Sequence, residues 1–382
     1  MFTPHRITTP PGQAVRQQRA AAFLMLASFA LCSLLILGTG CSSPATSHNA
    51  LPAGVAHAQS VRRVPVHLAP APIISTTVRS AHRHLYTFAP SNVGLMQPAV
   101  DAQGTVWVGE MHVNRLGSLN AQTGAVTSWE PPDGRYGIMT TTVDAQGNAW
   151  FAELYANYIG RFERRQQTFH LFPLGTWQGS PLGPQDVHFD GKGRLWFTAV
   201  EAGAIGQLDP QTGAIRLWPV PSSPSTLTLT PTGRVWFGIG GAIGNLDPAS
   251  GQISLYRLPN PQVQVFSMAT DRAGRLWFTE VLPGKLGMLD PTTGTLTELP
   301  VPTVSGGPPA LFALVIDHTG NIWFVDVGAN MLVRYAPGKH ALTFFRLSLP
   351  GSAPFGLTLD PAGQLWFTAG GSSANYIGEM AS

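Results

Sequence analysis

The chain has 382 residues, including 42 Gly and 33 Pro, and only 11% of its residues are charged. This composition favours short strands and tight turns over amphipathic helices. The formal charge of +3 comes from residues 1–83, which hold seven Lys or Arg and no acid. The remaining chain is −4 and lacks a basic stripe with interleaved aromatic residues, so nucleic acid is not an expected partner.

Residues 1–41 have the pattern of an export signal, because Arg16 and Arg19 precede an apolar run that ends in "GTGC". A cysteine directly after small residues resembles the lipidation signal of bacterial lipoproteins. The resemblance implies that Cys41 carries a lipid and anchors the protein to a membrane, outside the cytoplasm. Gly38 stands where that signal prefers Leu, so an uncleaved membrane anchor and a cleaved, secreted protein remain alternatives.

Residues 42–83 are rich in Ser, Ala, Pro and His and show no sustained period, so we expect a flexible linker. The domain that follows, residues 84–382, contains no cysteine. Disulfide bridges, thiolate metal sites and a cysteine nucleophile are therefore excluded from this domain.

One phrase, Gly-x-x-Trp, occurs seven times between residues 104 and 366, as in "GTVWVGE" at 104–110 and "GRLWFTE" at 274–280. The Trp residues are spaced by 40 to 46 residues, which is typical of propeller blades. Turns of the form D-x-x-G and D-P-x-T-G flank strand-like segments in each unit. The pattern predicts an all-β, seven-bladed β-propeller, a monomer with four antiparallel strands per blade.

Within each blade, "L-W-F-T" alternates, so we expect Leu and Phe to face one neighbouring blade and Trp the other. The Gly of "I-G" is expected to let another backbone approach closely. The last unit stops after its third strand, whereas "HLYTFAP" at 84–90 has the form of an outer strand. We therefore predict that this amino-terminal strand closes the last blade and removes an exposed edge.

"WFTE", followed by "N-x-I-G-R" and an outer "Y/F-x-L-P", resembles the streptogramin B lyases, also called the virginiamycin B lyase family, over nearly all of residues 84–382. The resemblance implies a seven-bladed propeller with a site on one face of the ring. It also implies a His base at the start of an inner strand, nearby acids, Mg²⁺, and elimination that opens a depsipeptide ester.

The sequence departs from this pattern at the implied base. The seven positions that lie eleven residues before each Trp contain no His; they are Met96, Met139, Gln185, Ser225, Phe266, Phe312 and Phe355. In "APFGL", Ala353 and Phe355 replace the acid and the His of the family's "EPHGI", and Ala369 replaces the last Glu of "WFxE". We expect the fold to be kept and the lyase chemistry to be absent.

Four acids end the Trp phrase on the same face, and these are Glu110, Glu153, Glu280 and Asp326. They fall in two pairs of neighbouring blades, so they are candidate ligands for Mg²⁺ or Ca²⁺. The alternative is that they belong to the blade pattern and are solvated or paired with Arg. Tyr155 and the three phenylalanines Phe266, Phe312 and Phe355 complete the candidate ligand face, although the phenylalanines and methionines could equally plug the channel.

Two functions of different class follow. The first is an envelope-tethered propeller that binds a small molecule, a cyclic peptide or a protein on one ring face. The second is a metal-dependent lyase or lactone-cleaving enzyme that acts on a cyclic ester. Four other histidines of the domain, His170, His188, His318 and His340, are assigned to outer strands or turns and to no site.

Overall fold

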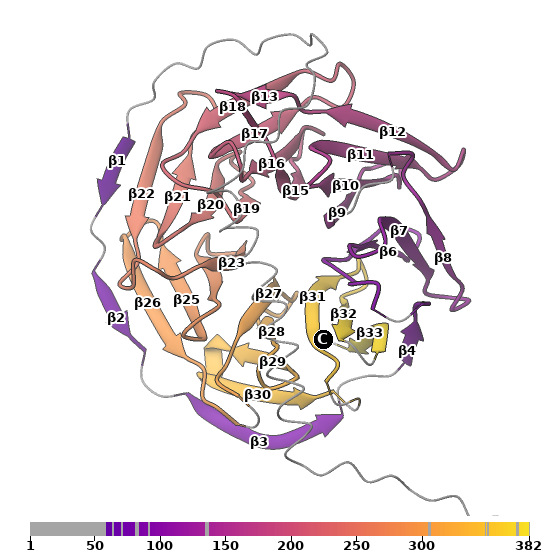
Figure 1. Ribbon diagram of the computed structural model, residues 1–382. Helices are drawn as coiled ribbons and strands as arrows, with labels where there is room; N and C mark the ends of the chain where they lie inside the picture. Colours follow the sequence, from indigo (N-terminus) through magenta and orange to yellow (C-terminus); the bar gives the residue numbers. More distant parts are fainter. Residues whose placement is uncertain are drawn as a thin grey trace, which may run out of the picture.

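The computed structural model describes residues 59–62, 65–69, 72–80, 84–90, 92–133, 137–304, 307–347, 349, 351–371 and 374–381. These residues form seven main sheets arranged as a ring around a central axis (Figure 1). We number the sheets as blades 1 to 7, in the chain order of their Trp residues. The ring confirms the predicted seven-bladed β-propeller.

Each blade has four antiparallel strands, which follow one another in order from the axis to the rim. The innermost strands are β5 (Ala99–Val100), β9 (Ile138–Val143), β15 (Pro184–Phe189), β19 (Thr226–Leu229), β23 (Val265–Thr270), β27 (Leu311–Ile316) and β31 (Pro354–Leu359). The second strands carry the Trp phrase and are β6 (Thr105–Glu110), β10 (Ala149–Glu153), β16 (Leu195–Ala199), β20 (Val235–Ile239), β24 (Leu276–Glu280), β28 (Ile322–Asp326) and β32 (Gln364–Gly371).

The third strands are β7 (Arg115–Asn120), β11 (Tyr158–Glu163), β17 (Ala204–Leu208), β21 (Ala242–Leu246), β25 (Lys285–Asp290), β29 (Met331–Ala336) and β33 (Ala374–Ala381). The fourth strands are β8 (Val126–Trp129), β12 (Thr168–Pro173), β18 (Ile215–Pro219), β22 (Ile253–Arg257), β26 (Thr295–Pro300), β30 (Ala341–Arg346) and β4 (His84–Thr87). A small hairpin of β13 (Thr176–Trp177) and β14 (Ser180–Pro181) lies between blades 2 and 3, and a 3-10 turn, η2 (Pro337–Lys339), precedes β30.

The turn before the Trp strand explains why Asp and Trp recur together. In six blades one Asp oxygen accepts backbone N–H groups of the turn, and the other accepts the Trp indole N–H at 2.8 to 3.2 Å. In blade 4, Thr230 takes the place of Asp and accepts the N–H of Arg234. The Asp therefore ties the turn to a large buried ring that packs between blades.

The glycine of the "I-G" pair serves the packing of an aromatic ring. A Cβ atom on Gly160 would lie 2.1 Å from Cζ of Phe151, and the same relation holds in four other blades. Each of these phenylalanines lies on the adjacent Trp strand and directly follows the Trp. The expectation of a close backbone approach was therefore wrong, because a side chain of the neighbouring strand fills the space that the missing Cβ leaves.

Strand β4 closes the ring, as the sequence predicts. It pairs antiparallel with β33, with Tyr86 opposite Ile377 and Leu85 opposite Gly378. Phe88, just beyond the strand, is almost completely buried and packs with Trp366 and with residues of blade 1. The first described strand of the domain thus joins the two ends of the ring.

The segment before β4 differs from the expected linker. Strands β1 (Gln59–Arg62), β2 (Val66–Leu68) and β3 (Ile73–Ser80) follow the rim and pair in parallel with β22, β26 and β30 (Figure 1). They add a fifth strand to blades 4, 5 and 6. The expected flexible linker over 42–83 therefore contains regular structure in its second half, because the outer edges of three blades supply backbone partners.

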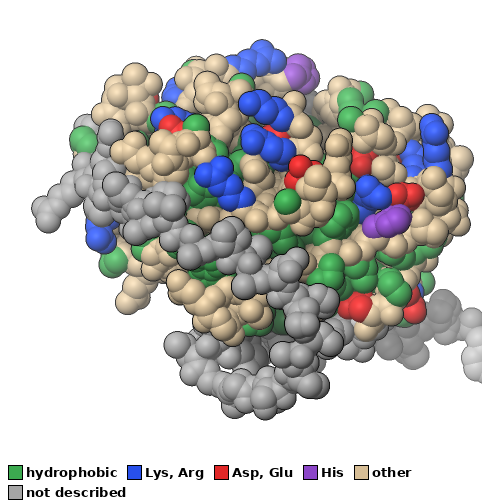
Figure 2. Space-filling model, turned by 90° about the horizontal axis from the view of Figure 1, so that it is seen from above, with side chains coloured by type: hydrophobic (Ala, Val, Ile, Leu, Met, Phe, Trp, Pro, Cys, Tyr) green, Lys and Arg blue, Asp and Glu red, His purple; other side chains and the backbone are tan. Residues whose placement is uncertain are grey.

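Figure 2 views the ring from its rim, where Lys and Arg side chains lie among Asp and Glu side chains on the visible surface. Among the residues that the structure describes, no helix is long and apolar enough to span a bilayer. The predicted export signal, including Cys41, lies outside the described residues.

Candidate functional site

The face on which the Trp strands end is filled at the axis by apolar side chains. Phe266, Phe312 and Phe355 form a cluster in which the ring centroids lie 4.5 Å, 5.3 Å and 5.3 Å apart. Met96 and Met139 belong to the same core, and both are nearly buried. We call these five side chains the axial plug. They come from equivalent inner-strand positions of five blades, which is why they converge on the axis.

Glu110 is bound within its own blade. Its Oε2 accepts hydrogen bonds from Nε and Nη2 of Arg115 at 2.9 and 2.5 Å, and its Oε1 accepts one from the hydroxyl of Ser128. The carboxylate is fully buried. A buried carboxylate that already accepts three hydrogen bonds is part of the blade, which matches the alternative that the sequence analysis left open.

Glu153 is also fully buried, but it has no cationic partner among the described residues. Burial raises the pKa of Glu153 to about 9, and the negative charge of Asp133 adds to this rise. The backbone amide of Ala156 opposes this rise in pKa. Neither carboxylate oxygen of Glu153, however, makes a hydrogen bond of good geometry. The Tyr158 hydroxyl donates to Asp133 at 3.0 Å rather than to Glu153.

Glu280 faces the third and fourth strands of blade 5. Burial raises the pKa of Glu280 to about 8; the charge of Glu298 adds to the rise and that of Lys285 opposes it. The Lys285 ammonium donates to Glu298, a residue that is 1% exposed. This acid therefore belongs to a buried Glu-Lys-Glu group inside one blade.

Asp326 accepts N–H groups from the loops at the end of its own blade. Its Oδ1 lies 3.1 Å from the amide nitrogens of both Ala310 and Ala329. Burial raises the pKa of Asp326 to about 6, and these backbone amides oppose the rise. Asp326 thus orders the loops that precede β27 and follow β28.

In the described residues, the contacts of the four acids that were predicted to bind a metal are with groups other than one another. The groups that shift the pKa of Glu153 and Glu280 are Asp133, Glu298 and Lys285, not the acids of the neighbouring blades. Within the described ranges, no group of three or more His, Cys, Asp or Glu side chains is placed to hold a metal ion.

Tyr155 is the exposed member of the candidate face, with 49% of its surface accessible. Its ring lies close to Gly137, where a Cβ atom would come within 2.6 Å of both Tyr155 Cδ2 and Glu153 Oε1. Tyr155 therefore covers the buried Glu153 from solvent, at the rim of this face.

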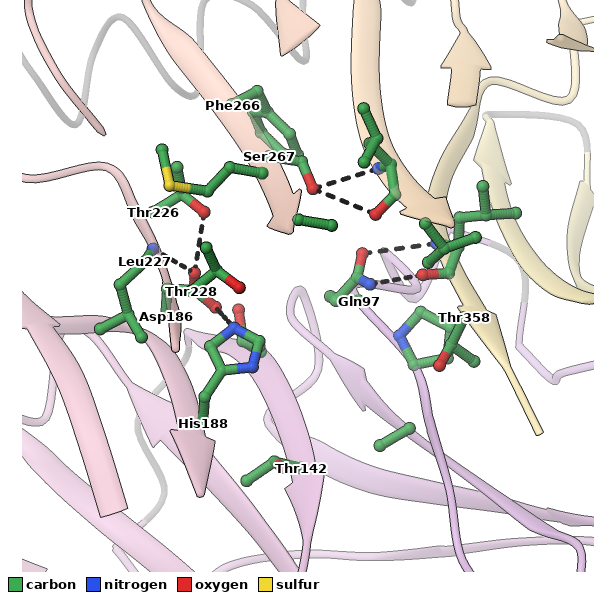
Figure 3. Close-up of a pocket in the computed structure, with 18 of the residues that line it drawn as sticks. Gln97, Thr142, Asp186, His188, Thr226, Leu227, Thr228, Phe266, Ser267 and Thr358 are labelled. Carbon is green, nitrogen blue, oxygen red and sulfur yellow. Dashed lines mark hydrogen bonds and ion pairs between the residues drawn. The ribbon is translucent and has the colours of Figure 1, made fainter. Parts of the chain in front are cut away.

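A cavity of about 430 Å³ occupies the axis beneath the axial plug (Figure 3). It is lined by the inner strands of all seven blades and extends to Thr270, Ile316 and Leu359, the last residues of their strands. Phe266 and Phe355 form part of its inner end. The apolar cluster is therefore both a plug for one channel mouth and the floor of a cavity below it.

Asp186 and His188 are the ionisable residues among the described residues that line this cavity. His188 lies in β15, an innermost strand, so its assignment to an outer strand or turn was wrong. The imidazole Nε2 lies 3.1 Å from Asp186 Oδ1, and Asp186 Oδ2 accepts hydrogen bonds from Thr226 Oγ1 and the Leu227 amide. The D-x-H spacing in a strand is the signal that could have placed both side chains on one side.

The residues that directly follow the seven positions eleven residues before each Trp also include side chains that join neighbouring blades. The Gln97 amide donates to the Leu357 carbonyl at 2.7 Å, between blades 1 and 7. Ser267 accepts the Leu314 amide at 3.1 Å, between blades 5 and 6. Asp186 makes the corresponding joint between blades 3 and 4 through Leu227 (Figure 3). These joints hold the cavity wall in place.

Comparisons with known proteins agree with this architecture. A sequence model of the virginiamycin B lyase family matches residues 84–380. A crystal structure of virginiamycin B lyase from Staphylococcus aureus is similar at a TM-score of 0.70 and 23% identity, covering 78% of this chain and 98% of that one. A catalytically inactive His→Ala variant of the S. aureus enzyme with quinupristin matches at 0.70 and 24%, with the same coverage. No curated protein matches the sequence.

Proposed function

The chain belongs to the virginiamycin B lyase family, and from that premise we propose that it is a binding propeller without lyase activity that takes a small ligand into the axial cavity. One observation carries this proposal. Phe355, which stands where the family resemblance implies a His base, is 3% exposed and packs against Phe266 and Phe312. A phenyl ring has no proton to exchange, so elimination loses its base at this position.

The acids support the same conclusion. Elimination of the implied type needs carboxylates and a cation that reach the substrate from the ring face. Glu110, Glu280 and Asp326 are instead buried, and each faces groups of its own blade. The space that remains near the axis is the cavity below the plug, and its volume of about 430 Å³ is within the range of small-molecule sites.

A direct assay tests the absence of lyase activity. We expect the purified protein, with millimolar Mg²⁺, to leave a streptogramin B depsipeptide intact, while the S. aureus enzyme opens it. The Phe355→His variant should stay inactive, because the restored imidazole still lacks accessible carboxylates. Ring opening by the unchanged protein would overturn the proposal.

A cavity-filling variant tests the binding role. We expect some members of a small-molecule library to raise the melting temperature of the protein, since a ligand that binds only the folded state stabilises it. Thr228 lines the cavity, so Thr228→Phe should abolish these shifts, whereas Thr232→Phe in an exposed turn of the same blade should keep them. A library without any hit that depends on Thr228 would contradict the binding role.

The second candidate is a metal-dependent lyase or lactone-cleaving enzyme on a cyclic ester. Family membership favours it, as does Glu153, whose pKa of about 9 would keep a general acid protonated at neutral pH. If this candidate were correct, Mg²⁺ or Ca²⁺ should raise the melting temperature, and Glu280→Gln combined with Asp326→Asn should remove that rise. We expect no such rise.

We also propose that the propeller acts outside the cytoplasm, tethered through a lipid on Cys41. The support is the sequence "GTGC" after an apolar run that follows Arg16 and Arg19. This part of the proposal is independent of the cavity and has its own test below.

A further inference from the structure

We propose that the axial cavity binds a small organic anion, a carboxylate with an apolar body, and that the His188 imidazole holds its charged end. This inference rests on the proposed function, since it names the class of ligand that the cavity would take. It concerns the cavity below the axial plug, on the other side of the plug from the face where the lyase resemblance places its site.

The first argument is the fixed orientation of His188. Its Nε2 faces Asp186 Oδ1 at 3.1 Å, so Nδ1 lies on the opposite edge of the ring and is turned away from Asp186 (Figure 3). The His188 side chain is 45% exposed and lines the cavity, whereas the Asp186 side chain is 11% exposed. The imidazole is therefore held by the wall and offers its second nitrogen to the cavity.

The second argument is the charge that faces the ligand. Burial opposes the ionisation of both partners, but Asp186 raises the pKa of His188, and His188 lowers the pKa of Asp186 together with the Leu227 amide and the Thr226 hydroxyl. The negative charge of Asp186 is thus directed at three donors in the wall. In the protonated imidazole, which Asp186 favours, the remaining N–H is directed inward, so the pair then presents a donor rather than an acceptor to a ligand.

The third argument is that the ion pair exceeds what the blade joint needs. Gln97 joins blades 1 and 7, and Ser267 joins blades 5 and 6, in each case with neutral groups bound to the backbone of the neighbouring strand. Asp186 alone, through Thr226 and Leu227, completes the same joint between blades 3 and 4. His188 bonds to Asp186 rather than to the neighbouring blade, and its imidazole lines the cavity.

The fourth argument is the division of the cavity wall. Hydroxyl groups line it near His188, from Thr142 and Thr228, and another, from Thr358, lies across the axis. The side formed by blades 5 and 6 carries the apolar residues Phe266, Met268, Ala269, Leu314, Val315 and Ile316, with Ser267 and Thr270 beside them. A small carboxylate with an aliphatic or aromatic body satisfies both sides, since its charged end meets the donors and its body removes apolar surface from water.

Three probes of equal chain length separate charge from shape: hexanoate, 1-hexanol and hexylammonium. The measurement is the pKa of His188 by NMR of ¹⁵N-histidine-labelled protein, with and without each probe. We expect hexanoate to raise the pKa of His188, because a carboxylate at Nδ1 stabilises the imidazolium. Hexylammonium should produce no rise. This measurement needs no variant and therefore does not depend on how a variant folds.

Variants then test the role of the side chain. His188→Gln should weaken hexanoate binding about tenfold or more, as the loss of a hydrogen bond to a charged group does, and should leave hexanol binding unchanged. The matched control is His170→Gln, which removes a histidine that is also paired with a carboxylate, Glu163 at 3.1 Å, but lies on an outer strand. The control should leave both affinities unchanged.

The outcomes separate the two proposals. Equal binding of hexanol and hexanoate, both unaffected by His188→Gln, would overturn the anion inference and leave the cavity as a ligand site. Binding of neither probe, together with no library hit that depends on Thr228, would overturn the proposed function as well.

Discussion

The carboxyl group of Glu153 lies in a fully buried position where both oxygens lack hydrogen bonds of good geometry, and the charge of Asp133, which acts on it, is negative. Glu110, at the same position of the neighbouring blade, forms an ion pair in which two nitrogens of Arg115 donate to one carboxylate oxygen. The same residue type at the same place in the repeat thus has opposite electrostatic surroundings. Its neighbours across the strands decide which surroundings each glutamate has.

Glu153→Gln should flatten the dependence of stability on pH. The folded pKa of about 9 lies above the ordinary 4.5, so the folded protein keeps a proton that the unfolded chain loses between these values. The contribution of this group is therefore fully present below pH 4.5 and is lost as pH rises toward about 9, at up to ~1.4 kcal/mol per pH unit.

We therefore expect the variant to be more stable than the unchanged protein at pH 8 and close to it at pH 4.5, in urea unfolding followed by Trp fluorescence. The control is Glu130→Gln, because Glu130 is exposed, and it should leave the curve unchanged. A pH profile that Glu153→Gln does not alter would show that this carboxyl group ionises normally.

The Asp of the turn before each Trp strand is a second residue with a measurable role. Asp317 accepts hydrogen bonds from Thr319, Asn321 and the Trp323 indole. Asp317→Ala should lower the free energy of unfolding by about 2–3 kcal/mol, because it removes bonds to a charged acceptor and leaves the buried indole N–H unpaired.

The matched control for Asp317→Ala is Thr230→Ala, at the position in blade 4 where Thr replaces Asp. This change should cost about 1 kcal/mol or less, since it removes a neutral hydrogen bond in a part-exposed turn. Urea midpoints measure both variants. Equal losses would mean that the Asp–Trp bond contributes nothing beyond the turn itself.

At the scale of the element, two kinds of amino-terminal strand have different roles. Strand β4 is the fourth strand of blade 7, and Phe88, just beyond it, is buried. Strands β1, β2 and β3 instead add parallel fifth strands to blades that are already complete. Strand β4 therefore closes the ring, while the other three cover edges.

Chains that begin at different residues separate these roles. A chain that begins at residue 81 should fold and melt somewhat below one that begins at residue 42, because three complete blades lose only an edge cover. A chain that begins at residue 92 should melt far lower or aggregate, since β33 is left with an unpaired edge. Differential scanning calorimetry gives the comparison, and equal melting of the chains from 81 and 92 would disprove closure by β4.

At the scale of the whole molecule, the ring has two different ends. Aromatic and Met side chains fill the axis at one end, and the cavity with Asp186 and His188 lies below them. The amino-terminal segment leaves the ring along the rim, past β3, β2 and β1 (Figure 1). A tether attached to this segment would hold the propeller by its rim and leave the axis accessible.

Cys41→Ser should abolish lipid labelling and release the protein from the membrane fraction. The reason is that only a cysteine thiol accepts the lipid in a signal of this type. Metabolic labelling with a clickable fatty acid in a bacterial host measures it, and Cys32→Ser, within the apolar run, is the control that should keep the label. Undiminished labelling of the Cys41→Ser protein would remove the lipoprotein assignment.

Much of the fold is predictable from the sequence, because each blade repeats a local pattern. The Asp turn, the Trp and the strand that follows form one short-range unit. Seven copies of this unit predict seven blades that pack against one another in a ring. The missing last strand likewise indicated β4. Strands β1 to β3 were missed because parallel pairing at an edge needs only backbone groups, although the β-branched run "IISTTVRS" was a signal for β3.

For the site, residue identities at a fixed position of the repeat are enough to show that the lyase His positions hold Met, Gln, Ser and Phe. The roles of the remaining residues depend on which side chains the folded ring brings next to them. Glu110, Glu153, Glu280 and Asp326 look equivalent in the repeat, yet their neighbours are Arg115, Asp133, Lys285 with Glu298, and backbone amides. Asp186 and His188 face a cavity because seven inner strands meet at the axis, and such convergence is a long-range property that no local pattern encodes.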